Sequence, residues 1–526
     1  MLNQLQELAA AQGGRIELLT GVAAGADLEA AEAARELDIP VHITLPLPEL
    51  MFHEDFGGDL ASDWPRAQRL IEGAKRGEGG STLRIDGGGL ARPGCYHETN
   101  LQLLLAADVV IAVWNGERTK KIGGTDEFVD AAARLKRPHV IIDPARDGKL
   151  ERRGNWADWP QTDHVLTEVN RNVAAFTTPT ARGPDERGGD GSAWQAFVAL
   201  DEAAKSSAGH FRRSLYWSVA LHFLAALIAA CTAAFSPVMY HHADTIDEPG
   251  SANVVATSRQ HVDRETGDVS SGHSGGSSFR VDVLHTLPKG LTLLEFLLVS
   301  VALRLMWQSQ RRHAQSIWRS MRFAAEVAHS QIMTARLLDP LKPLIVRHEP
   351  RWRRFALGMS LLAHRSVQSD SNFEQLKTKY LEGRIVNQGT DYFRRQLPHA
   401  EEYEQLLSRT SYWAAITAPI FIGVALFLKL FWSELVESDY LVAGLAAFLP
   451  VALPLVAGAA TSMIVATDVA RRAERYRIMA ERLDHVVALF PEVKTSGALG
   501  RIAAETEEIL LDELIEWYAA AKSTGH

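Results

Sequence analysis

The chain has 526 residues, of which 55 are Lys or Arg and 64 are Asp or Glu, so its formal net charge is -9. This acidic balance argues against a broad nucleic-acid surface, which requires clustered basic residues, so we expect no nucleic-acid partner. Only two cysteines, Cys95 and Cys231, are present, which excludes a fold stapled by several disulfides.

The first part of the chain alternates short apolar runs with helical stretches. The predicted strands are Ile16–Thr20, Val41–Leu45, Val109–Trp114 and Val140–Asp143. The predicted helices lie near Ala26–Leu37, Pro65–Lys75, His97–Ala106 and Asp126–Lys136. Apolar strands that alternate with helices indicate a parallel sheet covered on both faces. We therefore expect an α/β Rossmann-like sandwich in residues 1–145.

Two glycine-containing loops follow predicted strands of this domain. In such sheets ligands bind beyond the carboxyl ends of the strands, where the next helix presents free N–H groups. The predicted ligand-binding residues of the first loop are Thr20, Gly21, Gly25 and Asp27. Those of the second loop are Asn115, Gly116, Gly123, Gly124, Thr125, Asp126 and Glu127. Either loop alone is equally well explained as a tight turn with a helix cap. Two of them on strands expected to be adjacent favour a nucleotide-type pocket.

The charges in these loops predict how a ligand is held. Asp27, Asp126 and Glu127 would repel a phosphate at the helix ends, so we expect them to contact ribose hydroxyls or a base. Lys120 and Lys121 are the candidates for phosphate contacts.

These loops, taken with neighbouring motifs, resemble the SLOG superfamily, which includes the lonely-guy phosphoribohydrolases. The resemblance covers roughly residues 14–145 and is carried by LLTGVAAGADLEAAEAA, ITLPLPELMFHEDFG and AADVVIAVWNGERTKKIGGTDEFVDAAA. The matching positions outside the predicted ligand-binding residues are Asp55, Phe56, Asp108 and Trp114. The resemblance implies a Rossmann-like fold and a nucleotide-derived ligand.

The catalytic subfamily of this superfamily carries a P-G-G-x-G-T-x-x-E loop. Here Ile122 stands in place of the proline, the glycine spacing is shorter, and Glu127 comes one position early. The resemblance therefore implies ligand sensing, with no catalytic residue assigned. If the domain were an enzyme that cleaves an N-glycosidic bond, Glu127, Glu98 and Asp126 would be its acid/base candidates.

Four apolar stretches follow, each about as long as the roughly 20 residues that cross a bilayer as a helix. They are Ser214–Ser236, Leu287–Met306, Ser411–Ser433 and Leu441–Thr467. The predicted organisation after the α/β domain is a linker (146–193), a helix with the first hairpin (194–306), a cytoplasmic helical region (307–410), a second hairpin (411–467) and C-terminal helices (468–526). We expect an all-α membrane domain with cytoplasmic helical extensions.

Basic residues beside the four stretches lie on one side of the predicted membrane. They are Arg212, Arg213, Arg311, Arg312, Arg394, Arg395, Arg409, Arg471, Arg472, Arg475 and Arg477. By the positive-inside bias, both chain ends and the middle segment face the cytoplasm, and the expected location is the inner membrane. The outer loop 237–284 is predicted to be disordered. Its histidines (His241, His242, His261 and His273) follow no ligand spacing, so no metal site is expected.

The cytoplasmic helical segments carry a second resemblance. The stretches RSMRFAAEVAHSQ and KYLEGRIVNQGTDYFRRQ are similar to the SLATT family, the SMODS-and-SLOG-associating transmembrane effectors of bacterial conflict systems. Apolar residues recur at helical spacing in these segments, which suggests that the helices pack as a bundle or a coiled stem. A final acidic helix is expected over Ala503–Ala521.

One acid lies near the middle of the second predicted span. A carboxylate there costs a few kcal/mol unless it is paired, hydrated or protonated. Glu295 is therefore a candidate pore-lining or gating residue, although a hydrogen-bonded contact with His222 of the first span explains it equally well. Gly458 and Ser462 have the spacing that allows close helix packing.

These features lead to one interpretation and two alternatives. The leading hypothesis is a homo-oligomeric membrane effector in which the SLOG-like domain senses a nucleotide-derived ligand and controls a transmembrane pore, in bacterial antiviral or conflict defence. The alternatives are a membrane-tethered nucleotide N-glycosidase and a membrane scaffold that binds no ligand. Membrane lipid is an expected partner in every case.

Overall fold

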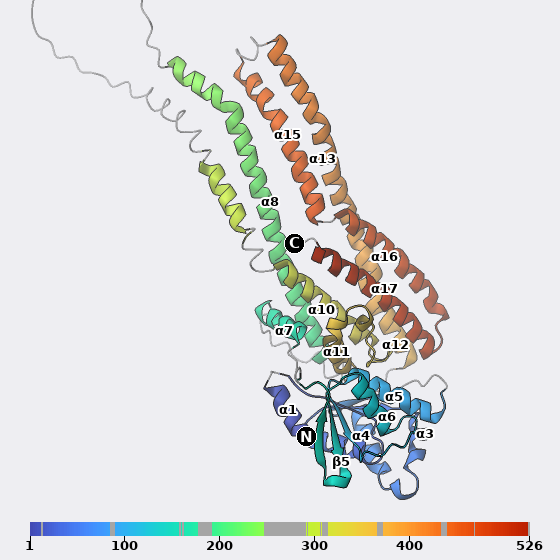
Figure 1. The fold of residues 1–526 in the computed structure, drawn as a ribbon. Coiled ribbons are helices and arrows are strands. Elements are labelled where there is room, and N and C mark those ends of the chain that lie inside the picture. Colours follow the sequence, from blue (N-terminus) through green and yellow to red (C-terminus); the bar gives the residue numbers. More distant parts are fainter. Residues whose placement is uncertain are drawn as a thin grey trace, which may run out of the picture. The chain divides into compact units, whose positions relative to one another are not determined.

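The chain forms two compact units, each built from separated segments. The computed structural model describes residues 1–11, 14–84, 90–156, 159, 163–176, 192–246, 291, 293–305, 307, 314–365, 372–432, 439–467 and 469–523 (Figure 1). The first unit comprises residues 1–208, 315–393 and 478–526. The second comprises residues 209–314 and 394–477.

The first unit begins with an α/β region that contains two three-stranded sheets. The first sheet has the order β1-β2-β3 and is parallel, with β1 at Leu18–Thr20, β2 at Val41–Leu45 and β3 at Gly80–Arg84. The second has the order β4-β5-β6, with β4 at Val110–Val113, β5 at His139–Asp143 and β6 at Lys149–Arg153. Among the described strands β1 and β4 belong to different sheets, so their expected adjacency is not seen as strand pairing.

The last strand corrects two expectations. β6 lies inside the predicted linker 146–193 and pairs antiparallel with β5, so the sheet is mixed and the α/β region extends past residue 145. The connection is a short turn through Pro144–Arg146, Asp147 and Gly148. A parallel neighbour would need a crossover of a dozen or more residues, so this short turn can only make a hairpin.

The helices of the α/β region cover the sheets through small and aliphatic side chains. They are α1 (Leu2–Ala10), α2 (Ala26–Glu36), α3 (Glu49–His53), α4 (Trp64–Lys75), α5 (Arg92–Ala106) and α6 (Thr125–Arg134). Leu28 and Ala31 of α2 and Ile71 of α4 are fully buried in one core with β2, all five of whose residues are buried. This α/β arrangement agrees with the sequence prediction in outline.

The rest of the first unit is a helical bundle. It contains α7 (His164–Phe176), the start of α8 (Ser192–Ile246), α10 (Ala314–Thr334), α11 (Arg353–Arg365), α12 (Phe373–Tyr380), the π-helical segment η6 (Leu381–Thr390), the end of α16 (Val469–Leu489) and α17 (Ser496–Ser523). Two short 3₁₀ turns, η4 (Leu344–Arg347) and η5 (Pro350–Trp352), connect α10 to α11. α7 also lies within the predicted linker, and its Val169 is buried in the main bundle core with Phe323 and Trp352. That interval is therefore partly structured.

A separate apolar cluster joins the bundle to the α/β region within this unit. Leu83 of β3 and Leu103 of α5 pack with Leu341 and with Leu361 of α11, and all four are less than a tenth exposed. Fully burying a leucine contributes about 1.5–3 kcal/mol. The two parts of the first unit therefore share a core and are not merely tethered by a flexible linker.

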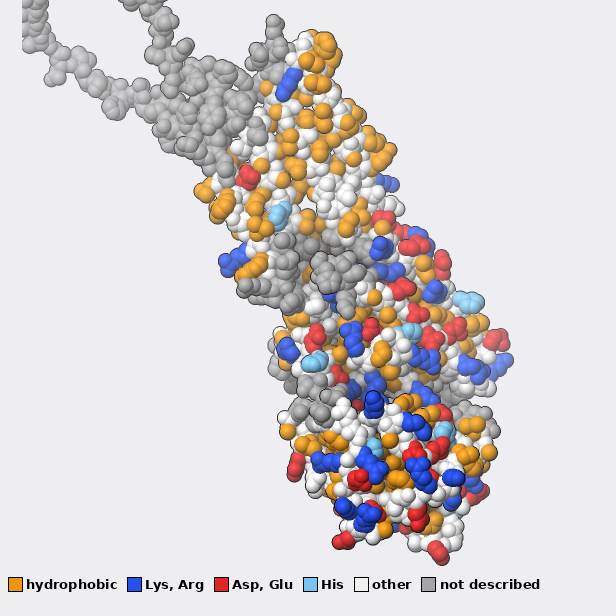
Figure 2. Space-filling model, in the orientation of Figure 1, with side chains coloured by type: hydrophobic (Ala, Val, Ile, Leu, Met, Phe, Trp, Pro, Cys, Tyr) orange, Lys and Arg blue, Asp and Glu red, His pale blue; other side chains and the backbone are white. Residues whose placement is uncertain are grey.

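The second unit holds apolar helices. α13 (Asp391–Phe431) and α15 (Tyr440–Thr467) form a hairpin, and the Ser411 hydroxyl lies 2.9 Å from that of Thr461 (Figure 1). Figure 2 shows hydrophobic side chains covering this hairpin, whereas charged groups are interspersed over the α/β region. Gly458 is exposed, and a Cβ built there would meet nothing within 4 Å. The contact within this hairpin forms instead at Ala457 and Thr461, and the close packing that the spacing of Gly458 and Ser462 allows stays a prediction.

Three described helices are long and apolar enough to cross a membrane. They extend over 192–232, 373–431 and 441–492, and they include most of the first and third predicted spans and all of the fourth. The second predicted span is described only in part: residues 293–305 are helical, which is shorter than the roughly 20 residues needed. The Ser214 hydroxyl donates to the Leu305 carbonyl at 3.3 Å, so this segment packs beside α8.

The predicted outer segments are described only at their edges. α8 continues to Ile246, beyond the expected end of the first span at Ser236. Residues 247–284 of the predicted outer loop, including His261 and His273, lie outside the described residues, as does most of the turn between α13 and α15.

Candidate functional site

The first glycine loop holds its own acidic residue. The backbone N–H groups of Gly21 and Ala23 donate to the carboxylate of Asp27, and a Cβ at Gly21 would come within 3.2 Å of its Oδ2. Crowding of this carboxylate by the loop raises its pKa, although the two N–H donors act in the opposite direction. Two of the amides of this loop are thus already engaged by the Asp27 carboxylate.

The other predicted residues of the first loop have structural roles in the turn. The Thr20 hydroxyl accepts the Val22 N–H at 3.2 Å. Gly25 precedes α2 with φ of 94°, a conformation that residues with a Cβ rarely adopt, and no atom lies within 4 Å of its Cβ position. The loop therefore brings open backbone to the start of α2.

The second loop also binds its own carboxylates. The Gly123 N–H donates to Glu127 at 2.7 Å, and the Lys120 N–H donates to Asp126 at 3.0 Å. Gly124 is the N-cap residue and Thr125 begins α6. Earlier in the same loop, Asn115 accepts the Glu117 N–H and Gly116 has φ of 86°.

The N-terminal half of α5 gathers several of the predicted motifs. The Asn100 amide donates to the Gly123 carbonyl at 2.9 Å, and His97 Nδ1 lies 3.0 Å from Glu127. The Tyr96 hydroxyl donates to Asp55, and burial together with this carboxylate raises the pKa of Tyr96. Tyr96 also packs against the hydrophobic cluster that contains Val22 of the first loop. The structure thus places the second loop and the Asp55 motif around one helix.

The acid/base candidates of the enzyme alternative are held in their ionised forms. The Gly123 N–H lowers the pKa of Glu127, and the Lys120 N–H lowers that of Asp126. The Gln102 amide and the Lys342 ammonium lower the pKa of Glu98. A general acid needs a pKa near the working pH, so these environments disfavour that role for all three.

Other side chains of α5 contact the helical bundle, which sequence reasoning missed. Lys342 Nζ lies 3.0 Å from Glu98 Oε1, although the two residues are 244 positions apart. Just after α5, Asp108 lies 2.8 Å from Arg353 and 3.3 Å from Arg354. In the sequence, Asp108 was identified only as a position that matches the SLOG resemblance.

The predicted gating acid lies in the second unit. Glu295 is in the helical stretch 293–305 and is half-buried. His222 Nδ1 donates to the Ser218 carbonyl of its own helix at 2.8 Å. Within the described part of the chain, no hydrogen bond or ion pair joins Glu295 to His222.

No protein-family model, curated protein or solved structure matches this chain. The site is therefore interpreted from its own geometry.

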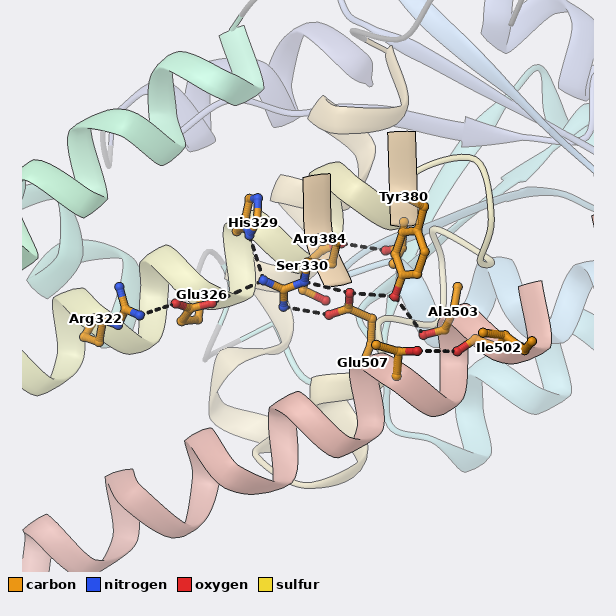
Figure 3. Close-up of polar contacts among 11 residues, drawn as sticks. Arg322, Glu326, His329, Ser330, Tyr380, Arg384, Ile502, Ala503 and Glu507 are labelled. Atoms are coloured by element: carbon orange, nitrogen blue, oxygen red, sulfur yellow. Dashed lines mark hydrogen bonds and ion pairs between the residues drawn. The ribbon is translucent and has the colours of Figure 1, made fainter. Parts of the chain in front are cut away.

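A buried ionic cluster in the bundle was also missed. We call it the Arg384 cluster; it consists of Arg384, Glu507, Glu326, His329 and Tyr380. Arg384, in η6, donates from Nε and Nη2 to the two oxygens of Glu507, both at 2.9 Å, and from Nη1 to His329 Nδ1 at 2.7 Å (Figure 3). Tyr380 donates to the same carboxylate at 3.1 Å. The side chains of Arg384 and Glu507 are 3% and 0% exposed, so water cannot compensate either charge.

The sequence held a signal for this cluster. Leu499, Ala503, Glu507, Leu511 and Leu514 are buried at helical spacing along α17. An acid within an apolar stripe implies a buried partner, because an unpaired charge there is very costly.

The charges of the cluster determine its protonation state. Burial raises the pKa of Glu326, but the positive charges of Arg322 and Arg384 outweigh burial and lower it to about 2. Burial, aided by the charge of Arg384, lowers the pKa of His329 to about 4. Burial also raises the pKa of Glu507, and Arg384 again reverses the effect. Near neutral pH both carboxylates are ionised and His329 is neutral, as its acceptor role toward Arg384 requires.

Glu507→Gln should destabilise the first unit, because Arg384 would keep its buried charge with less compensation. We expect a loss of about 3–5 kcal/mol in the free energy of unfolding. The matched control is Glu508→Gln, since the neighbouring Glu508 pairs with Arg347 at 3.0 Å on the surface. Exposed pairs contribute roughly 0–1 kcal/mol. The free energies of unfolding are measured with denaturant, and equal losses in the two variants would contradict the assignment of a buried pair between Arg384 and Glu507.

The cluster also predicts a pH dependence of stability. The folded protein binds the His329 proton more weakly than the unfolded chain, so this contribution is fully present above pH 6.5 and is lost as pH falls through about 4. His329→Asn keeps an acceptor for Arg384 but does not titrate. Between pH 6.5 and pH 4 the unfolding temperature should fall less steeply for the variant than for the wild type. Parallel slopes would show that His329 is not held neutral.

Proposed function

We propose that this chain is a membrane effector in which a SLOG-like, Rossmann-like domain senses a nucleotide-derived ligand and controls an oligomeric pore. The membrane module would be SLATT-like, with four spans in the inner membrane, cytoplasmic termini and Glu295 lining or gating the pore. The expected setting is bacterial antiviral or conflict defence. The observation that carries the proposal is the double contact of α5.

α5 contacts the second glycine loop with one set of side chains and the bundle with another. Asn100 and His97 bind the loop, whereas Glu98 and Leu103 bind the bundle. Because His97 and Glu98 are consecutive, a ligand that moves the loop also displaces the helix that the bundle contacts. A ligand that prefers one arrangement shifts the population toward it.

Three helices that lead into or out of the apolar segments also extend into the first unit, which holds the proposed sensor. α8, α13 and α16 each cross the boundary between the two units as unbroken helices. Displacement of the bundle is therefore carried into the apolar segments by backbone hydrogen bonds, without an intervening loop. This continuity supports a gate more than a passive anchor, for which one span is enough.

The loop geometry narrows the class of ligand. Asp27, Asp126 and Glu127 already accept the loop amides, so the remaining lone pairs suit donors such as ribose hydroxyls or a base amino group. Lys120 and Lys121 are exposed beside the second loop and are free to meet a phosphate. A nucleotide-derived ligand offers both kinds of group.

Gly123→Ala should abolish ligand-dependent membrane depolarisation. Gly123 has φ of 76°, and an added Cβ would lie 2.7 Å from Tyr96 Cβ, so the loop must move away from α5. Gly148→Ala is the matched control, because Gly148 has φ of 69° with open space around its Cβ position and lies in the turn between β5 and β6, outside both glycine loops. Both changes carry a backbone cost of about 1–2 kcal/mol, so only the steric effect differs. Equal depolarisation in cells that produce either variant, at equal membrane insertion, would contradict a role for this loop.

Lys342→Glu should uncouple sensing from the membrane response, because it places two carboxylates at the contact between α5 and the bundle. Purified protein should still show the thermal shift that wild type gives with members of a nucleotide panel, while depolarisation is lost. Adding Glu98→Lys to the same chain should restore the response. Arg347→Glu, which reverses a charge within the bundle, is the control. If no nucleotide changes the unfolding temperature of the wild type, the scaffold alternative is favoured. Formation of a product from a nucleotide monophosphate would instead favour the enzyme alternative.

A further inference from the structure

One continuous helix combines two kinds of local geometry, α-helical and π-helical. α12, η6 and α13 form a single helix over Phe373–Phe431, whose middle segment, Leu381–Thr390, is π-helical. A π-helical turn closes its hydrogen bonds from residue i to i+5, so it holds one residue more than an α-helical turn. Such turns are rare in proteins, and those that occur are often found at functional sites. The helix beyond η6 contains the third predicted span.

Side chains of η6 fix this segment in its π-helical register. Arg384 bonds α17 through Glu507 and α10 through His329 (Figure 3). A two-point guanidinium–carboxylate pair is strong and tolerates little change in orientation. Ile385 is fully buried, and a Cβ at Gly383 would approach Met333 Cε to 2.8 Å. Three consecutive residues therefore depend on the π register.

The segment beyond η6 makes contacts that report its rotation. In the second unit, Glu401 of α13 pairs with Arg477 of α16 at 2.7 Å. α16 is α-helical from Val469 to Leu489. A change of register in η6 therefore moves Glu401 relative to Arg477, while α16 gains no equivalent rotation.

We propose that η6 is a rewinding joint that sets the rotational position of α13 and is held in its π-helical form by Arg384 and Glu507. Converting one π turn to an α turn advances the following helix by one residue. That step rotates α13 by about 100° and shifts it by about 1.5 Å. Loosening of the pair between Arg384 and Glu507 permits the step. The inference rests on the proposed membrane module but needs neither the ligand nor the pore.

Deleting one residue of η6 tests the joint. Asn387 is exposed and lies after Arg384, so its deletion removes the extra residue and leaves the ionic pair in place. A one-residue deletion in a regular helix instead rotates everything beyond it by about 100°. Deletion of Arg395, which is exposed in α-helical α13, is the matched control.

The readout is cross-linking in the full-length chain within native membranes. Glu401→Cys and Arg477→Cys are joined by a short bismaleimide, with Cys95→Ala and Cys231→Ala as background. The parent and the Asn387 deletion should cross-link equally, whereas the Arg395 deletion should fall to background. If the Asn387 deletion also falls to background, η6 does not absorb a residue and the proposal is overturned.

A second variant tests the ionic pair as the lock. Glu507→Gln should reduce the cross-link, because the π turn can then convert to an α turn and rotate α13. Adding the Asn387 deletion should restore the cross-link, because the extra residue of the π turn is gone and α13 keeps its rotational position. If both chains are folded and cross-link like the parent, the pair does not hold the joint. Because no arm measures depolarisation or ligand binding, failure here is distinguishable from failure of the proposed function.

Discussion

The first unit depends on a charge that has no access to water. Arg384 is 3% exposed and its guanidinium is satisfied from two elements, Glu507 on α17 and His329 on α10. Two buried ions are stable together only when geometry and hydrogen bonding are nearly ideal. This requirement fixes the positions of α10, η6 and α17 relative to one another. Aliphatic packing alone would specify these positions less strictly. The same requirement holds in place the segment that leads into α13.

The glycine loops show a second consequence of charge. Phosphate-binding loops usually keep their amide donors free, but here Asp27, Asp126 and Glu127 accept those donors from within the loops. Each loop therefore has a stable closed form in the ligand-free chain. For the proposed nucleotide-derived ligand to bind, it would have to offer these carboxylates better partners or bind beside them, so the acidic residues would discriminate between ligands.

The sequence predicts elements best where one physical signal dominates. β2 was predicted with its observed bounds, Val41–Leu45, because the apolar Val41, Ile43 and Leu45 recur at every second position, as in a strand. β3 was missed because GSTLR offers little apolar character, and β6 because KLERR is an exposed edge whose charges resemble a linker. The glycine loops were readable from local spacing. Their self-binding carboxylates and the contact between Glu98 and Lys342 were not, since such partners depend on tertiary geometry.

The route from the second loop to the apolar helices runs through side-chain contacts of α5 and then through continuous helices. α5 is a helix that contacts both the second loop and the bundle, and the bundle continues as helices into the second unit. A flexible linker between these parts would dissipate a small displacement, because each added residue brings further conformations. The shared core of Leu83, Leu103, Leu341 and Leu361 removes that freedom. Under the proposed function, the response would be limited by whether one of these helices can change its register, and η6 is a place where that change needs no broken helix.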